Sequence, residues 1–266
     1  HQPDHRTQPI GRIAEVLGES MAPGMEIDIA IRSYGLPNEW PEGVLAAARR
    51  TPASVLDRDR EGRRDLRELA LVTIDGADAR DFDDAVFAKK TAKGYVLYVA
   101  IADVAHYVRE GTDLDEEALN RGTSVYFPDR VIPMLPEELS NELCSLKPGV
   151  DRLARSVEFV LTNSGRIEQA KFHSTVICSK QRFSYEEAMA VLEREPTGGI
   201  ERMLHDAHRL AQQLRQARFR AGALDLDVPE RKVLLDAKGR VSEVRRVEND
   251  VSHQLIEEFM LLANET

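Results

Sequence analysis

Short apolar runs separated by turn-forming residues cover the middle of the chain and predict a sheet. Residues 69–74 form an apolar, β-prone run, and residues 85–87 form another. Residues 95–102 are apolar almost throughout, which predicts a central strand. The basic, turn-like segment 89–94 lies between the last two runs, so we expect them to pair as a hairpin.

Further strands alternate with helices along the rest of the chain. The remaining predicted strands are 124–127, 156–162, 167–178 and 244–247. The predicted helices are 42–50, 113–121, 185–193, 200–220 and 253–264. The fourth of these helices is amphipathic, with Leu204, Leu210 and Leu214 at helical spacing. This arrangement predicts an α+β fold in which a mixed or antiparallel sheet carries packed helices.

The two ends of the chain show different patterns. Residues 10–18 and 24–32 alternate between apolar and polar positions, which predicts a β-hairpin or two strands of a small barrel. Residues 51–66 are rich in Arg and Asp and are interpreted as a linker with helical turns. The chain starts at His1 without apolar periodicity, as a processed end with missing upstream sequence would.

The last helix is apolar on most of its faces, which predicts burial on nearly every side. We therefore expect the fold to continue beyond Thr266 and the chain to be a fragment. The apolar positions in question are Leu255, Ile256, Phe259, Met260, Leu261 and Leu262.

Composition narrows the class of protein. With 266 residues, 42% hydrophobic and 31% charged, the chain suits one large domain, or one domain plus a fragment, of a globular protein without a membrane span. Cys144 and Cys178 have no metal or redox spacing, which favours a reducing compartment, most simply the cytoplasm. A net charge of −10 argues against nonspecific nucleic-acid binding, although a metal-dependent nuclease can still be acidic.

Five carboxylates stand in the ten residues between two of the predicted strands: Asp75, Asp78, Asp81, Asp83 and Asp84. An exposed, solvated loop is the ordinary explanation of such a run, but flanking apolar strands make it less suitable here. An EF-hand fails because its loop needs Glu at the twelfth position. A phosphatase of the haloacid dehalogenase type matches poorly, since its Asp-x-Asp ends an apolar strand. Acids this close repel one another unless cations lie between them, which suggests metal-dependent phosphate chemistry.

The spacing of the acids supports a shared site. On an extended backbone Asp81 and Asp83 face the same way, whereas Asp84 faces the other side unless the chain bulges. A loop through Gly76 can bring Asp75 back towards them. Three or four carboxylates can thus surround one or two cations, and two cations would stabilise the attacking and leaving oxygens of a phosphoryl displacement.

Several sequence blocks, in order, resemble one family. Residues 73–85, Thr-Ile-Asp-Gly-Ala-Asp-Ala-Arg-Asp-Phe-Asp-Asp-Ala, are similar to the signature of the ribonuclease II / ribonuclease R family of 3′→5′ exoribonucleases, also called the RNB family. The resemblance spans about residues 66–266 and is strongest to the ribonuclease R branch. Its other blocks are residues 99–104, 120–128, 133–136, 139–146, 222–226 and 255–264.

The resemblance implies a domain organisation. Residues 1–35 would be the tail of an OB-fold cold-shock domain, and residues 36–65 a linker. Residues 66–266 would be the N-terminal part of the exoribonuclease catalytic domain. The family's later block with paired arginines, of the form Ser-Pro-Ile-Arg-Arg-Tyr, does not occur in these 266 residues. We therefore expect the isolated chain to be catalytically silent, because one of those arginines is expected to stabilise the transferring phosphate.

The resemblance also implies an activity: processive hydrolysis of single-stranded RNA from its 3′ end to nucleoside 5′-monophosphates, with Mg²⁺ or Mn²⁺ and a two-metal mechanism. Asp75, Asp81 and Asp84 would be metal ligands, and Asp83 would be indispensable to the chemical step. Asp78 is interpreted instead as a turn or capping residue. The alternative function is a catalytically inactive, RNA-binding regulatory relative. No membrane and no obligate protein partner are inferred.

Four further positions match RNA-contacting residues of the family. Tyr126 matches a tyrosine that stacks on a base near the RNA 3′ end, and its alternative is a strand aromatic in the core. Tyr185 and Glu257 or Glu258 fall at substrate-channel positions, with packing or surface roles equally open. Asn141 is either a polar contact near the phosphate or a turn residue.

Other candidate residues receive non-catalytic interpretations. A second stacking position that is Phe in some relatives falls on Leu226, which argues against a two-sided aromatic clamp. Cys144 lies in an apolar neighbourhood and is expected to be a small core residue. His106, His173 and His253 lack the spacing of a metal site or a triad, so surface or core roles are favoured.

Overall fold

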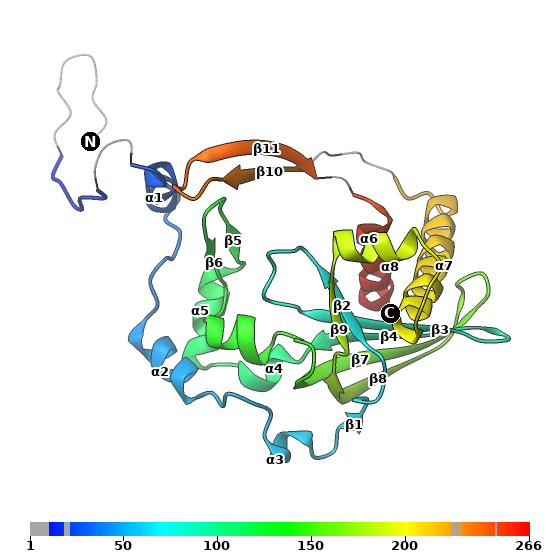
Figure 1. The fold of residues 1–266 in the computed structure, drawn as a ribbon. Helices are drawn as coiled ribbons and strands as arrows, with labels where there is room; N and C mark the ends of the chain where they lie inside the picture. The colour runs from blue at the N-terminus through cyan, green and yellow to red at the C-terminus, as the bar shows by residue number, and fades with distance from the viewer. Residues whose placement is uncertain (1–10, 19–21, 225–227, 229, 248) are drawn as a thin grey trace.

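The structure, a computed structural model, describes residues 11–18, 22–224, 228, 230–247 and 249–266. A seven-stranded sheet with the order β1-β8-β7-β4-β3-β2-β9 forms its centre (Figure 1). The β1–β8 and β2–β9 pairs at its two edges are parallel and the inner pairs are antiparallel, which confirms the predicted mixed sheet. Its strands are β1 (Arg64–Asp65), β2 (Val72–Asp75), β3 (Asp84–Lys90), β4 (Gly94–Ala102), β7 (Asp151–Thr162), β8 (Ile167–Cys178) and β9 (Gln181–Ser184).

The strand alternation of β4 sends its side chains into two separate cores, which explains why its apolar run is unbroken. Leu97 and Val99 lie in one core, and Tyr98 and Ala100 lie in the other. Helices α6 (Tyr185–Leu192), α7 (Gly199–Arg220) and α8 (Val251–Glu265) cover the first core. Helices α2 (Glu42–Arg50) and α5 (Asp113–Arg121) and a π-helical turn (Glu138–Leu143) contribute to the second. The α+β class predicted from the sequence is thereby confirmed.

The predicted hairpin is present as β3 and β4, which pair from Asp84↔Ile101 to Lys90↔Tyr95. The predicted helices 42–50 and 113–121 match α2 and α5, and the other three predicted helices match α6, α7 and α8 within two residues at each end. Helix α5 begins as its sequence suggests, because the Thr112 hydroxyl accepts a hydrogen bond from the Asp115 amide.

The predicted N-terminal hairpin is wrong. Met25–Ser33 form helix α1, and residues 11–18 have no regular structure, while residue 10 lies outside the described residues. Ile27, Ile29 and Ile31 satisfy a strand period, but Ile27 and Ile31 also satisfy the four-residue spacing of a helix face. Ile27 and Ile31 are buried whereas Ile29 is half exposed, so the helix is the stable form because it packs one face against Ile132.

The last helix is less enclosed than predicted. Leu255, Ile256 and Phe259 are buried against the first core, whereas Met260, Leu261 and Leu262 are only half-buried. One face of α8 packs on α6 and α7. The prediction of burial on nearly every side therefore holds for that face alone.

Shorter elements surround the sheet. They are α3 (Asp57–Arg60), α4 (Val104–Tyr107), β5 (Val125–Tyr126), β6 (Val131–Ile132), β10 (Glu230–Leu235) and β11 (Val241–Val247). The β10–β11 hairpin runs from the side of α7 and α8 towards α1, where Gly239 at its tip lies near Pro23 (Figure 1). None of the helices in the described part of the chain has the length and apolar character needed to cross a membrane.

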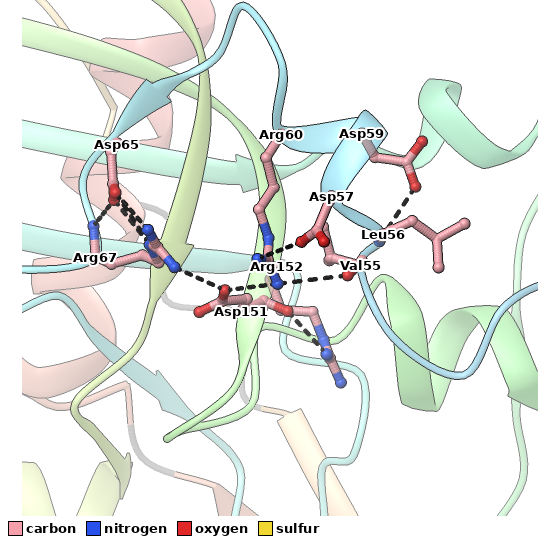
Figure 2. A network of polar contacts seen from close by, with 9 residues as sticks. All are labelled: Val55, Leu56, Asp57, Asp59, Arg60, Asp65, Arg67, Asp151 and Arg152. Carbon is pink, nitrogen blue, oxygen red and sulfur yellow. Dashed lines mark hydrogen bonds and ion pairs between the residues drawn. The ribbon is translucent and has the colours of Figure 1, made fainter.

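An ion-pair network fastens the segment before β2 to the start of β7 (Figure 2). We call it the arginine brace: Asp57, Arg60, Asp65, Arg67 and Asp151. Asp151 lies 3.1 Å from the nearest guanidinium nitrogen of both Arg60 and Arg67. Arg67 also lies 2.6 Å from Asp65, and Arg60 lies 3.0 Å from Asp57. Segment 57–67 is therefore attached to the sheet by charge as well as by β1.

Candidate functional site: an acidic loop between adjacent strands

The acidic residues occupy the connection between two neighbouring strands of the sheet. Asp75 is the last residue of β2 and Asp84 is the first residue of β3. Because these strands are antiparallel neighbours, the two carboxylates lie at the same end of the sheet. Residues 76–83 form the loop between them, and we call residues 75–84 the acidic loop.

Hydrogen bonds to the segment after the π-helical turn hold the second half of this loop. The Phe82 amide donates to the Ser145 hydroxyl at 3.1 Å, and that hydroxyl donates to the Arg80 carbonyl at 2.7 Å. The Leu146 amide donates to the Phe82 carbonyl at 2.7 Å. Phe82 is buried in the second core, so it fixes the backbone between Asp81 and Asp83.

The carboxylates of the loop lie close enough to perturb one another. Burial, together with the charges of Asp83 and Asp75, raises the pKa of Asp84 to about 7. Desolvation also raises the pKa of Asp75, with added repulsion from Asp83 and Asp81. Asp83 remains exposed at the surface, yet partial desolvation and the charge of Asp81 raise its pKa as well. The four predicted site acids are therefore linked by electrostatic repulsion, Asp81 through its effect on Asp75 and Asp83.

The donor chemistry of the loop fits a hard cation. One oxygen of Asp84, Oδ2, is buried and has no hydrogen-bond partner among the described residues. Such an oxygen, with further carboxylates nearby, is typical of a ligand set for Mg²⁺ or Mn²⁺. In the part of the chain that the structure describes, no group of three or more His, Cys, Asp or Glu side chains is arranged so that it could hold a metal ion. The assignment of Asp75, Asp81 and Asp84 as ligands stays a prediction.

Asp78 differs from the other acids of the loop. Its side chain is 71% exposed and lies 2.7 Å from Lys232 on β10, and this contact lowers its pKa. The exposed ion pair agrees with the interpretation of Asp78 as a residue outside the predicted ligand set.

Tyr126 lies on the surface beside the loop. It is 67% exposed, so its alternative interpretation as a core aromatic is wrong. Its hydroxyl donates a long hydrogen bond of 3.5 Å to Asp81 Oδ2. The ring is thus accessible to a nucleobase next to the acids, although base stacking stays a prediction.

Tyr185 also lies near the acids but packs differently. Burial, with added repulsion from the charges of Asp75, Asp84 and Asp83, raises the pKa of Tyr185 to about 12. Its ring stacks on His253 of α8, with centroids 3.8 Å apart and planes 17° apart. One face of Tyr185 is therefore already covered. His253, for which the sequence favoured a surface or core role, is held in this stack by Asp250 at 2.9 Å.

Asn141 lies in the π-helical turn at the edge of an open cavity of about 1090 Å³. The cavity reaches the acidic loop, since Ala79, Arg80 and Phe82 of that loop also line it. Asn141 Oδ1 accepts a 3.2 Å hydrogen bond from the Ser140 hydroxyl. The structure therefore places Asn141 on a surface shared with the loop, and its contact with phosphate stays a prediction.

The structure distinguishes the two glutamates of α8. Glu258 is buried and pairs with Arg218 of α7 at 2.6 Å, which joins the two helices. The Glu257 side chain is 41% exposed and lies 3.5 Å from the same guanidinium group. Of the two, Glu257 is the one that is accessible to solvent.

The remaining candidates behave as predicted or lie elsewhere. Cys144 is buried in the second core, and burial raises the pKa of its thiol to about 12, as befits an inert core residue. His106 lies 3.3 Å from Asp59, and His173 lies 3.2 Å from Glu158. Leu226 lies outside the described residues.

One residue near the loop was missed by sequence reasoning. Arg182 of β9 contacts the carbonyl oxygens of Gly76 and Ala77 through its Nη2 atom. The strand that carries it, Gln181–Ser184, has only four residues and was not predicted. A single arginine in a short polar stretch gives no periodic signal, so only the parallel pairing of β9 with β2 reveals its position.

Comparison with known proteins defines the class to which this fold and loop belong. The RNB domain family matches residues 63–266, and the cold shock domain family matches residues 1–41. The chain belongs to the RNB family. It is 45% identical to the Ribonuclease R of Escherichia coli over 99% of its own length and 33% of that protein. The chain thus spans about a third of the length of this relative.

Solved structures agree with the family. The chain is similar to Mycoplasma genitalium RNase R in complex with double-stranded RNA, with a TM-score of 0.90 and 34% identity over 94% of this chain and 45% of the other. It is also similar to yeast Ssd1, a pseudonuclease, with a TM-score of 0.67 and 21% identity over 91% of this chain and 31% of the other. The latter likeness is one of fold alone.

Proposed function

We propose that this chain is the metal-binding part of a processive 3′→5′ exoribonuclease that hydrolyses single-stranded RNA to nucleoside 5′-monophosphates in the cytoplasm. The observation that carries the proposal is the acidic loop, where Asp75, Asp83 and Asp84 are desolvated by burial and repelled by neighbouring carboxylates on a fold of the RNB family. A protein that only binds RNA gains little from such repulsion towards phosphate, because each unpaired carboxylate opposes an anionic ligand.

Each residue of the site has a proposed task. Asp75, Asp81 and Asp84 would hold Mg²⁺ or Mn²⁺, which supplies charge neutralisation and an activated water when bound. Asp83, exposed at the surface of the loop, faces the reacting phosphate and is indispensable to the chemical step. Tyr126 stacks on a base near the 3′ end, at about 1–3 kcal/mol per base, and does so for any base. Asn141, Tyr185 and Glu257 contact the RNA along the approach to the loop.

The proposal is tested on 5′-end-labelled single-stranded RNA with the full-length protein. We expect stepwise shortening from the 3′ end with release of nucleoside 5′-monophosphates, and its loss in EDTA. Asp83→Asn is expected to lower the rate by about 10³-fold while RNA binding is retained. Asp78→Asn removes a charge from the same loop at an exposed, paired position, so it should retain activity. Undiminished activity of Asp83→Asn would contradict the assignment.

The second candidate function is an RNA-binding regulatory relative without catalysis. The likeness in fold to Ssd1, a pseudonuclease, shows that this fold is compatible with such a function. The same assay separates the two candidates. RNA binding without any shortening, whether or not Mg²⁺ is added, would support the regulatory function.

A further inference from the structure

Arg182 lies on the strand next to the one that ends in Asp75. Strand β9 pairs in parallel with β2, with Arg182 opposite Thr73 and Ser184 opposite Asp75. Because side chains of paired residues point to the same face, Arg182 projects from the face of the sheet that also carries Thr73 and Asp75. Ile74 and Phe183 alternate to the opposite face, in the core beneath α6 and α7.

From this face the Arg182 guanidinium reaches the first half of the acidic loop. Its Nη2 atom donates to the Gly76 carbonyl at 2.7 Å and to the Ala77 carbonyl at 2.9 Å. The guanidinium carbon lies 5.2 Å from the centroid of the Phe82 ring. One planar group thus contacts both halves of the loop, and Ser145 and Leu146 fasten only the second half.

The burial of Arg182 and the nearby carboxylates make its contact with the loop energetically important. Arg182 is half-buried, and its Nε atom is buried without a hydrogen-bond partner among the described residues. An arginine desolvated in this way is costly unless its charge is compensated, and the charge of Arg182 acts on the carboxylates of Asp75 and Asp78 in the loop. Its positive charge opposes the desolvation that acts on Asp75.

We propose that Arg182 is a positioning residue, which fixes the backbone at Gly76 and Ala77 so that Asp75 faces Asp81 and Asp84. Its hydrogen bonds go to the protein backbone, so it supports the carboxylates without touching the phosphate. This inference rests on the proposed function where it concerns metal binding. Outer partners of metal ligands typically change metal affinity by about 10–100-fold when removed.

The test measures two properties of this chain, the hydrogen exchange of the amides at residues 76–79 in EDTA and the Kd for Mn²⁺. Arg182→Ala should accelerate exchange at these amides and weaken Mn²⁺ binding by about tenfold or more. Added millimolar guanidinium chloride should restore part of the affinity, whereas the same concentration of NaCl should not. Lys232→Ala is the matched control, since Lys232 also contacts the loop but through the exposed Asp78 side chain. It should leave both quantities nearly unchanged.

The outcomes separate the inference from the proposed function. If the parent chain binds no Mn²⁺ but Arg182→Ala accelerates exchange, the positioning role stands and the metal assignment fails. If the parent chain binds Mn²⁺ and Arg182→Ala changes neither quantity, or Lys232→Ala changes both as strongly, the inference is overturned. If Arg182→Ala does not fold, Arg182→Lys replaces it in the test. This variant keeps the positive charge but cannot lie flat against Phe82, so it should show faster amide exchange at residues 76–79 and weaker Mn²⁺ binding, both to a smaller extent. If Arg182→Lys leaves both the amide exchange and the Kd for Mn²⁺ unchanged, the proposed role of the planar guanidinium group is overturned.

Discussion

The arginine brace and the acidic loop are both rich in aspartate, and the fold provides them with opposite surroundings. In the brace every aspartate lies within 3.1 Å of a guanidinium nitrogen, and the pKa of Asp65 is lowered to about 2 by hydrogen bonds from Arg67 (Figure 2). In the loop Asp78 is paired with Lys232, but the charges that act on Asp84 are those of Asp83 and Asp75, and burial together with these charges raises the pKa of Asp84 to about 7. Paired acids stabilise a fold, whereas buried, unpaired acids reduce its stability, a cost that the cation proposed for the loop would offset.

The largest expected effect on stability is at Asp84. Asp84→Asn should raise the free energy of unfolding of the metal-free chain by about 2 kcal/mol at pH 8, because it removes a buried, repelled charge. The folded-state pKa of about 7 lies above the ordinary aspartate value of 3.8. The charge therefore destabilises the parent increasingly as the pH rises from about 4 to 7. The gain of the variant should grow over this range and stay constant above it.

Urea denaturation in EDTA at several pH values measures this difference. Asp78→Asn, at the exposed and paired position of the same loop, serves as the control and should change stability by less than about 0.5 kcal/mol. A loss of stability in Asp84→Asn at pH 8 would mean that the charged carboxylate is stabilised in the metal-free chain, contrary to the comparison.

A smaller effect of the opposite sign is expected in the brace. Asp151→Asn removes the carboxylate shared by Arg60 and Arg67, both 3.1 Å away, and should lower the free energy of unfolding by about 1 kcal/mol. The same denaturation experiment measures the loss, which should shrink in high salt because the network is partly exposed. Glu243→Gln, in an exposed pair with Arg245, should show no measurable change. An equal response of the two variants would argue that the brace is no more than a set of surface pairs.

The smallest effect is expected at Asp65. Its pKa of about 2 is below the ordinary aspartate value of 3.8. The side chain is largely exposed, so Asp65→Asn should lower the free energy of unfolding by only about 0.3 kcal/mol at pH 7 after allowance for solvent screening. A carboxylate with a lowered pKa stabilises the fold above its unfolded-state value, and this contribution is lost as the pH falls towards 2. Parent and variant should therefore converge between pH 4 and pH 2 in thermal unfolding. A difference that widens on acidification would contradict the pairing of Asp65 with Arg67.

The sheet region was predictable because the apolar residues of each of its main elements follow a single repeat, that of a strand or that of a helix. The run at residues 95–102 and the leucines of residues 200–220 allow a single interpretation, and both elements were found. The stretch with Ile27, Ile29 and Ile31 fits a strand and a helix equally, so the choice depended on the tertiary contact with Ile132. Elements as short as β1 and β9 are too short to show a periodic pattern of apolar residues. Each pairs in parallel with a strand more than a hundred residues away in the sequence, which no local pattern predicts.

The candidate site was predictable as a set of residues, but its arrangement required the fold. The clustering of the acids and the resemblance to the family named Asp75, Asp81, Asp83 and Asp84, and the structure places all four in one loop. The stacking of Tyr185 on His253 and the contact of Arg182 with the loop join residues far apart in sequence. No local pattern records such contacts. The domain boundaries at residues 35 and 65 stay predictions.

The parallel pairing of β2 with β9 has a consequence for the order in which a ribosome builds the site. Asp75 is synthesised early, but its strand pairs with Ser184 only after about 110 further residues, which takes roughly 5–20 s at typical rates of translation. Arg182 arrives in the same late segment. The pairing of β2 with β3 can form earlier, because β3 follows β2 directly along the chain. We therefore expect the contacts of Arg182 with Gly76 and Ala77 to be absent from the nascent chain during that interval.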